Sequence, residues 1–256
     1  MVSTSADRTI ALMYHAIGQP VAIDADPHYA VEITRFSEQL ATCVKHGGAA
    51  ISARDFLAGR SGVILTFDDG HGSNYDLAFP ALVAAGASAD FFVNPMQVGT
   101  RQFASWSQLR EMADGGMSIQ SHGFDHRYYL TDLSPARLRE DLRRSRLEIE
   151  EKVGHPVTLL APPGGRTPFG LTAVARECGF THVLNSRPGQ IRRGPARMLP
   201  RMAVNAGLNL PTLESWLRGG RALLRAQVRY AVLDLAKRVL GNQTYESVRE
   251  RFVDAA

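Results

Sequence analysis

Short apolar runs typical of buried strands alternate with helical stretches along most of this 256-residue chain. The strand-like runs are TIALMYH, VILTF, ADFFVN, MSIQSH, VTLLAPP, HVLNS and RMAV. Strands separated by helices favour a parallel sheet, because each helix returns the chain to the edge where the next strand begins. There are enough of these units for a closed or nearly closed barrel, in which functional groups lie where strands end and loops begin.

Four segments between these runs carry helix signals. They are residues 34–46, 105–114, 134–153 and 171–178. The third begins with Ser134 as an N-cap and Pro135 in the first turn, and it ends at Gly154. The second opens with Ser105 and Gln108 in the spacing of a capping box. These end signals place the helices between the strands that a parallel sheet requires.

The last fifty residues differ from this repeated pattern. The sequence LESWLRGGRALLRAQVRYAVLDLAKRVLG is one long helical pattern that Gly219 and Gly220 could interrupt. We therefore expect a barrel over residues 1–206 and a basic amphipathic helical extension over residues 207–256. Such a helix would suit an anionic membrane face. A helix packed on the barrel, with its basic face in solvent, is the preferred interpretation.

Composition excludes several classes of function. A net charge of +4 is too small for the dense basic surface of a dedicated nucleic-acid binder. Residues 187–201 contain five arginines, but no aromatic residues lie among them to stack bases, so we expect no nucleic-acid partner. No secretory signal and no run of eighteen apolar residues is visible, which favours a cytoplasmic protein. The two cysteines lack the spacing of a metal site or a disulfide framework.

Two adjacent aspartates end the strand-like run VILTFDDG. Neighbouring side chains on a strand point to opposite faces, so Asp68 and Asp69 should not do the same job. Two carboxylates this close also repel each other unless a cation or a shared proton intervenes. A strand followed by a tight turn is the simpler interpretation of this motif taken alone.

Two histidines, His122 and His126, follow in SHGFDH. On an extended strand they would lie about 13 Å apart, which is too far for a shared metal. Gly123 and Asp125 make a turn plausible, and a turn would bring the two rings together. With one aspartate they would form a three-ligand zinc site with a fourth, open position. The other aspartate could then accept a proton from the activated water. Two surface histidines in a loop are the alternative.

TFDDG at 66–70, followed by SHGFDH at 121–126, resembles the polysaccharide deacetylases, carbohydrate esterase family four, which share the chitooligosaccharide deacetylase homology domain. The resemblance covers roughly residues 9–205. LMYHAI and RFSEQLATCVKHGG are similar to the subgroup that acts on exopolysaccharides. The resemblance implies a distorted (β/α) barrel of about seven parallel strands. It also implies a divalent metal, usually Zn²⁺ but otherwise Co²⁺, Ni²⁺ or Mn²⁺, and removal of N-acetyl groups from an amino sugar or glycan.

The resemblance assigns roles to the motif residues. It makes Asp68 the general base, and Asp69, His122 and His126 the metal ligands. Gly123 stands where the family usually has serine or threonine, so the loop must be held in another way.

The family's third motif, Arg-x-Pro-Tyr-Gly, can be aligned in two registers. RTPFG at 166–170 matches by letters, whereas APPGG at 161–165 directly follows the strand-like VTLL and is favoured on geometry. In that register Ala161 replaces the arginine that braces the base, and Arg166 could fold back in its place. The predicted substrate contacts around this motif are Pro163, Gly164, Gly165 and Tyr128.

The family's fifth motif, Leu-x-His, which supplies the general acid, is missing. The corresponding run LPRMAV has Arg201 and no histidine. His15, at the end of the first strand, is the candidate acid. A histidine that only hydrogen-bonds, or proton transfer by water or by the base, are the alternatives. A small non-sugar amide as substrate and a non-catalytic glycan-binding relative also remain open, although a binding site would not need Asp68. The sequence does not indicate an oligomeric state.

Overall fold

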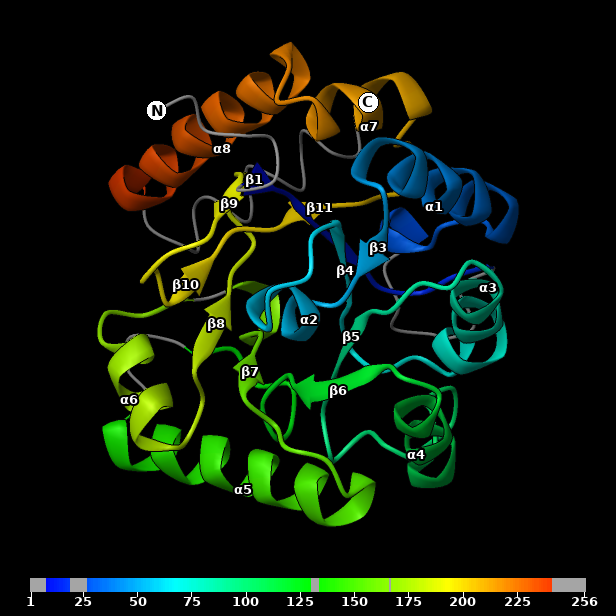
Figure 1. Ribbon diagram of the computed structural model, residues 1–256. Helices are drawn as coiled ribbons and strands as arrows, with labels where there is room; N and C mark the ends of the chain where they lie inside the picture. Colours follow the sequence, from blue (N-terminus) through cyan, green and yellow to red (C-terminus); the bar gives the residue numbers. More distant parts are fainter. Residues whose placement is uncertain (1–7, 19–26, 130–133, 166, 241–256) are drawn as a thin grey trace.

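The computed structural model describes residues 8–18, 27–129, 134–165 and 167–240. Its main sheet curves strongly, and helices surround it (Figure 1). The strand order is β10-β8-β7-β6-β5-β4-β2-β11, and β3 pairs with the beginning of β4. All these pairings are parallel, as the alternation of strands and helices predicts. The strands are β2 (Ala11–Tyr14), β3 (Ala50–Ile51), β4 (Val63–Phe67), β5 (Asp90–Val93), β6 (Ser118–Ser121), β7 (Leu159–Leu160), β8 (His182–Leu184), β10 (Met198–Leu199) and β11 (Met202–Ala203).

The two ends of this strand order meet in one short stretch of chain. β10 pairs with β8 and β11 pairs with β2, yet only Pro200 and Arg201 separate them. The sheet therefore bends round into a nearly closed, distorted (β/α) barrel, which confirms the expected fold class. The described sheet has nine strands rather than about seven. Two features account for the difference. The last run is divided at Pro200, which cannot donate to the ladder, and β3 is a short addition to β4.

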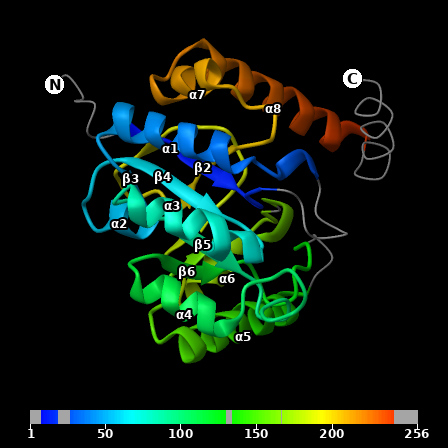
Figure 2. The same cartoon turned by 90° about the vertical axis from the view of Figure 1, so that its right-hand side faces the viewer.

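The helices are α1 (Ile33–Gly47), α2 (Ala53–Leu57), α3 (Phe79–Ala84), α4 (Trp106–Asp114), α5 (Pro135–Val153), α6 (Leu171–Glu177), α7 (Leu210–Leu217) and α8 (Arg221–Leu240). Most of them form an outer layer, whereas the short α2 lies across one end of the barrel (Figures 1 and 2). A π-helical turn spans Asn74–Ala78, and short 3-10 turns span Pro27–Tyr29 and Pro163–Gly165. A small antiparallel pair, β1 (Arg8–Thr9) and β9 (Ile191–Arg192), lies apart from the main sheet.

The predicted helix ends are confirmed. The Ser134 side chain accepts a hydrogen bond from the backbone N–H of Arg137. Ser105 and Gln108 form both halves of the capping box on α4. Gly154 ends α5 in the left-handed conformation, which glycine adopts at little cost. These ends set where each helix returns the chain to the sheet.

Alternate side chains of β4 face two different cores. Leu65 and Phe67 belong to the large cluster that includes residues of the outer helices. Ile64 belongs to a smaller cluster inside the barrel, together with Phe92. This alternation places Thr66 and then Asp68 inside the barrel, where Arg201 donates to both. The site residues that follow β4 thus begin from a fully buried strand.

As far as residue 240, the C-terminal segment forms two helices, and the chain breaks between them where the glycine pair predicts. Leu213 and Trp216 of α7 are buried in the large cluster, and α7 packs on α1 (Figure 2). On α8, however, Leu224, Val228 and Val232 are more than half exposed. Apolar and basic residues therefore share the exposed surface of the described part of α8. The division of the chain at residue 206 stays a prediction.

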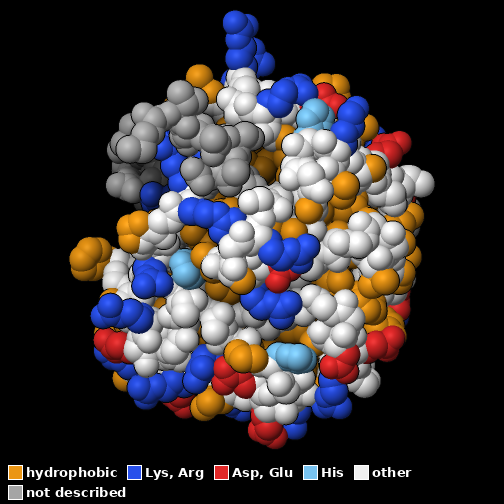
Figure 3. Space-filling view, viewed as in Figure 1, with side chains coloured by type: hydrophobic (Ala, Val, Ile, Leu, Met, Phe, Trp, Pro, Cys, Tyr) orange, Lys and Arg blue, Asp and Glu red, His pale blue; other side chains and the backbone are white. Residues whose placement is uncertain are grey.

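The surface shows no sorted basic face in the view of Figure 3. Lys and Arg side chains are interspersed there with acidic and apolar ones. None of the helices in the described ranges combines the length and hydrophobicity needed to cross a bilayer. The cytoplasmic location stays a prediction.

Candidate metal centre

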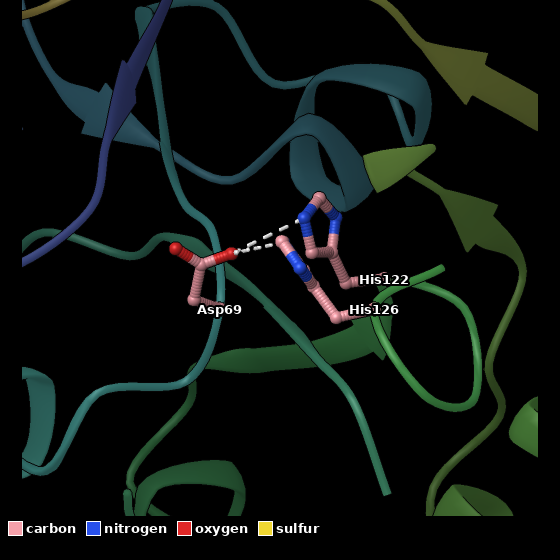
Figure 4. A group of neighbouring side chains, drawn as sticks. All are labelled: Asp69, His122 and His126. Atoms are coloured by element: carbon pink, nitrogen blue, oxygen red, sulfur yellow. Dashed lines mark ion pairs between the residues drawn. The ribbon is translucent and has the colours of Figure 1, made fainter. Parts of the chain in front are cut away.

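Asp69, His122 and His126 converge at one edge of the barrel (Figure 4). Oδ1 of Asp69 lies 3.3 Å from Nε2 of His122 and 3.2 Å from Nε2 of His126. Asp69 follows β4 and His122 follows β6, and only β5 separates these strands. Because the strands are parallel, their carboxyl ends lie at the same edge, which explains how residues so far apart in sequence meet.

The loop after β6 turns as the pair of histidines requires. Gly123 has φ 79° and His126 has φ 60°, so the chain curls back instead of continuing as a strand. The Asn94 side chain donates to the carbonyl oxygens of His122 and Gly123. Ser145 Oγ also donates to the Gly123 carbonyl, at 3.0 Å. These contacts fix the backbone that carries both rings.

Besides its left-handed φ, lack of space also favours glycine at position 123. A Cβ at this position would lie 2.5 Å from the hydroxyl oxygen of Tyr129. That hydroxyl donates to Asp141 Oδ2 at 2.6 Å, and the same carboxylate oxygen accepts from the Phe124 N–H at 3.3 Å. The Tyr129–Asp141 pair thus occupies the space of the family's usual serine or threonine side chain and holds the loop in its place.

The donor set fits a divalent cation. Nδ1 of His122 lies 2.8 Å from the carbonyl oxygen of Ala161, and a carbonyl can only accept, so Nδ1 donates. Nε2 then carries a lone pair that faces Oδ1 of Asp69, another electron-pair donor. Two ligands held about 2.1 Å from a tetrahedral zinc ion are about 3.4 Å apart, close to the observed spacing. One carboxylate and two imidazoles also match the three protein ligands of an open zinc site.

The electrostatics of the cluster favour a positive charge at the same point. Burial alone would raise the pKa of Asp69, but the neighbouring imidazoles of His122, His126 and His71 hold that pKa well below its usual value. The hydrogen bond to Asp69 in turn raises the pKa of His126. A cation placed between these groups would balance the negative charge of Asp69, which protons on the imidazole rings balance when no cation is bound.

Asp68 forms a separate, buried ion pair with Arg201. Nη1 and Nη2 of Arg201 lie 2.6 and 2.8 Å from Oδ1 and Oδ2 of Asp68, and both side chains are almost fully buried. Burial alone would raise the pKa of Asp68, but Arg201 first and His122 next hold it below its usual value. The two adjacent aspartates therefore have different surroundings, as predicted, although Asp69 lies in a left-handed turn after β4 and not on the strand itself.

Arg201 is the site residue that the sequence analysis missed. It lies between β10 and β11, where the barrel closes, and its guanidinium enters the interior above the Phe92 ring. The usable signal was an arginine within the otherwise apolar run LPRMAV, at a position that should be buried. Arg166, the predicted brace for the base, lies outside the described residues. In the described part of the chain the guanidinium on Asp68 comes from Arg201.

The third-motif register APPGG adjoins the site. Ala161 follows β7 directly, and its carbonyl binds the His122 ring. At Gly164 a Cβ would lie 2.8 Å from the Tyr128 ring, and the Tyr128 ring centroid is 6.0 Å from that of His126. The Gly165 N–H already donates to the Pro162 carbonyl at 2.9 Å, and the substrate contacts of this turn stay predictions.

His15 follows β2, and its Nδ1 is buried without a hydrogen-bond partner among the described residues. Its ring packs against Tyr29 at 4.8 Å. Burial lowers the pKa of His15, although Asp69 and Asp68 act in the opposite direction. A histidine with a lowered pKa is neutral near pH 7, and this works against the general-acid role, which stays a prediction.

His71 is a further neighbour of the cluster that the sequence analysis did not single out. Its Nε2 lies 3.4 Å from Oδ2 of Asp69, the oxygen that does not face the other two histidines. Its ring stacks on Phe103. No signal in the sequence indicated this contact beyond the position of His71 two residues after Asp69.

The fold and the cluster define a class of protein: a distorted (β/α) barrel with an Asp-His-His site at the carboxyl edge of its strands. Comparison with known proteins specifies the family. Residues 58–183 match the family model of polysaccharide deacetylase. The chain therefore contains a polysaccharide deacetylase domain, and the resemblance carried by its motifs is confirmed.

Individual relatives agree with this assignment. YxkH of Bacillus subtilis (strain 168), which is named provisionally as a polysaccharide deacetylase, is 29% identical over 148 residues. That match covers 57% of this chain and 53% of YxkH, so the chain spans about half the length of this curated relative. IcaB from Ammonifex degensii is 28% identical with a TM-score of 0.67, over 86% of this chain and 97% of that one. BC0361, a polysaccharide deacetylase from Bacillus cereus, is 22% identical with a TM-score of 0.73, over 82% of this chain and 69% of that one, and supports the fold.

Proposed function

We propose that this protein is a metal-dependent hydrolase that removes N-acetyl groups from an amino sugar or glycan. The observation that carries the proposal is that two adjacent aspartates have different surroundings: one lies in a candidate metal site and the other next to it as a separate carboxylate. Asp69 meets two imidazoles, while Asp68 remains a separate carboxylate beside them. A pure binding site would need the first arrangement but not the second.

Asp69, His122 and His126 would hold the metal, which is Zn²⁺ or another divalent ion. When bound, such an ion would supply polarisation of the amide carbonyl and a lowered pKa for the attacking water. His122 is pre-organised for this task, because the Ala161 carbonyl fixes its tautomer with Nε2 facing the site.

Asp68 would accept the proton of the attacking water. Arg201 occupies one lone pair on each Asp68 oxygen, which leaves further acceptor positions on both. The same ion pair keeps Asp68 ionised and fixes its direction, so that the base needs no reorganisation when the water reacts.

The products are acetate and a free amine, so one proton must reach the leaving nitrogen. Asp68, which has just received a proton from the water, is the favoured donor, because burial keeps His15 neutral. His15 is the other candidate. The Gly164 N–H would contact the oxyanion, and Tyr128 would contact the sugar ring.

The test combines metal content with acetate release. The purified chain is assayed on N-acetylglucosamine oligomers, poly-N-acetylglucosamine, peptidoglycan fragments and small non-sugar acetamides. We expect one divalent ion per chain and acetate release from at least one amino sugar. Asp69→Ala should lose the metal and the activity together, whereas Asp68→Asn should keep the metal and lose the activity.

The outcomes separate the competing functions. Release from small acetamides only would assign a non-sugar amide substrate. Metal binding with no turnover on any acetylated compound would favour a glycan-binding relative. A chain that binds no divalent ion would overturn the proposal.

A further inference from the structure

We propose that His71 is a positioning residue that holds the Asp69 carboxylate with Oδ1 turned toward the metal position. This inference rests on the metal site of the proposed function. It assigns a task to a histidine that the family motifs did not single out.

The two oxygens of Asp69 have different partners. Oδ1 faces His122 and His126, whereas Oδ2 lies 3.4 Å from Nε2 of His71. His71 does not belong to the group of three residues whose ligand atoms all lie within 4.8 Å of one another. It therefore sits behind the carboxylate, in the place from which an N–H can donate to the oxygen that the metal leaves unused.

The Asp69 side chain projects from an uncommon turn, and the terminal torsion of an aspartate carboxylate is broad and roughly two-fold. The φ of Asp69 is 73°, a left-handed conformation that residues other than glycine seldom adopt, and Gly70 continues the turn with φ 76°. The carboxylate at this turn could otherwise rotate and present either oxygen, or both, to a cation. A donor on Oδ2 selects one rotation and keeps Oδ1 free for the metal.

His71 is itself held firmly. Its ring stacks on Phe103 with centroids 5.4 Å apart and an interplanar angle of 18°. Its backbone forms an isolated bridge with Phe103, and its carbonyl accepts the Asn74 N–H at 2.9 Å. The His71 side chain is only 10% exposed, so its contact with the carboxylate is shielded from solvent. Hydrogen bonds are stronger in such a shielded, low-dielectric environment than in water. The ring is thus anchored from one side and directed at Asp69 from the other.

The test is the metal dissociation constant of the full chain, measured by competition with a chromophoric chelator for Zn²⁺ and Co²⁺. His71→Phe keeps a flat ring for Phe103 but removes the donor, and should weaken binding by about 10- to 100-fold. His71→Gln returns an N–H near the Nε2 position and should bind closer to the parent. His155→Phe, the same change at an exposed histidine far from Asp69 in sequence, is the matched control and should bind as the parent does.

The spectrum of bound Co²⁺ separates positioning from direct ligation. If His71 positions Asp69, the Co²⁺ complex of His71→Phe keeps the coordination number of the parent while binding more weakly. If His71 is itself a ligand, the visible bands change as one nitrogen is lost, and the proposal is overturned. An unchanged dissociation constant in His71→Phe overturns it as well.

Two further arms keep the test decisive. If His71→Phe does not fold, Phe103→Leu replaces it. This change loosens the His71 ring but leaves its N–H donor in place. Metal binding should then weaken by less than the roughly 10- to 100-fold loss expected for His71→Phe. A Phe103→Leu variant that binds as tightly as the parent counts against the proposal. A parent that binds no metal removes the proposed function too, whereas a parent and a His71→Phe variant that bind equally well overturn only this inference.

Discussion

Replacing Arg201 with methionine should be among the most damaging single changes in the barrel. Methionine is unbranched and apolar like the stem of arginine but is shorter and carries no charge, so Asp68 would remain as a buried carboxylate without Arg201. The parent pair is bidentate and excludes solvent, with N–O distances of 2.6 and 2.8 Å. Breaking such a pair leaves one full charge inside the protein, and the desolvation free energy of that charge is no longer compensated.

The magnitude follows from the geometry. Two charges with centres about 4 Å apart attract each other by about 4 kcal/mol at an effective dielectric constant of 20. Removal of one partner from a buried pair is measured at about 3–5 kcal/mol, which agrees with this figure. We therefore expect Arg201→Met to lower the free energy of unfolding by about 3–5 kcal/mol at pH 7.

The loss should depend on pH in a defined direction. In the parent the pKa of Asp68 is lowered, so the pair stabilises the fold above the unfolded pKa of about 3.9, and this stability is lost as pH falls through the folded pKa. In Arg201→Met burial acts alone and raises the pKa of Asp68 above that of the unfolded chain. The buried charge then destabilises the variant at neutral pH, and the penalty fades as acid protonates Asp68. The acid limb of the kcat/KM profile should move to higher pH for the same reason.

Urea unfolding at pH 7 and at pH 4 measures the first effect, and the pH profile of acetate release measures the second. Asp68→Asn and the double variant complete a double-mutant cycle, in which the double variant should lose less stability than the two single losses combined. A loss below about 1 kcal/mol at pH 7 would place the pair in the range of exposed ion pairs. If the acid limb of the kcat/KM profile also stays at the same pH, the proposal that Arg201 keeps Asp68 ionised is refuted.

Two further predictions test the loop and the ion. Gly123→Ala should destabilise the protein by about 1–3 kcal/mol in chemical unfolding, because it adds a left-handed penalty of about 1–2 kcal/mol and a Cβ 2.5 Å from the Tyr129 hydroxyl. Adding Tyr129→Phe to Gly123→Ala should recover the part of the loss that comes from the Cβ contact, but not the left-handed penalty. If Gly123→Ala costs the same free energy of unfolding with Tyr129 and with Phe at position 129, the hydroxyl does not fill the space. Zn²⁺ at one hundred times its dissociation constant should raise the free energy of unfolding by about 2.7 kcal/mol, seen as a higher melting temperature that a chelator reverses. Asp69→Ala should show no such rise, and a rise of the same size there would mean that the ion binds elsewhere.

Local patterns in the sequence predicted the secondary-structure elements and the residues of the candidate metal site. The caps at Ser105 and Ser134 and the C-terminal glycines act within a few residues, so they can be recognised without the fold. The motifs TFDDG and SHGFDH, through their resemblance to the polysaccharide deacetylases, assigned Asp69, His122 and His126 as ligands. The structure brings these residues together because the parallel strands β4 and β6 end at the same edge.

Only the tertiary structure decided what surrounds those residues. Arg201 reaches Asp68 across 133 residues of sequence, because the barrel closes between β10 and β11 and turns that one side chain inward. The Tyr129 hydroxyl fills the space that glycine leaves at position 123, and burial rather than residue type sets the direction of the His15 pKa. Such contacts depend on how curved elements pack in three dimensions, and a single sequence carries no local pattern that records them.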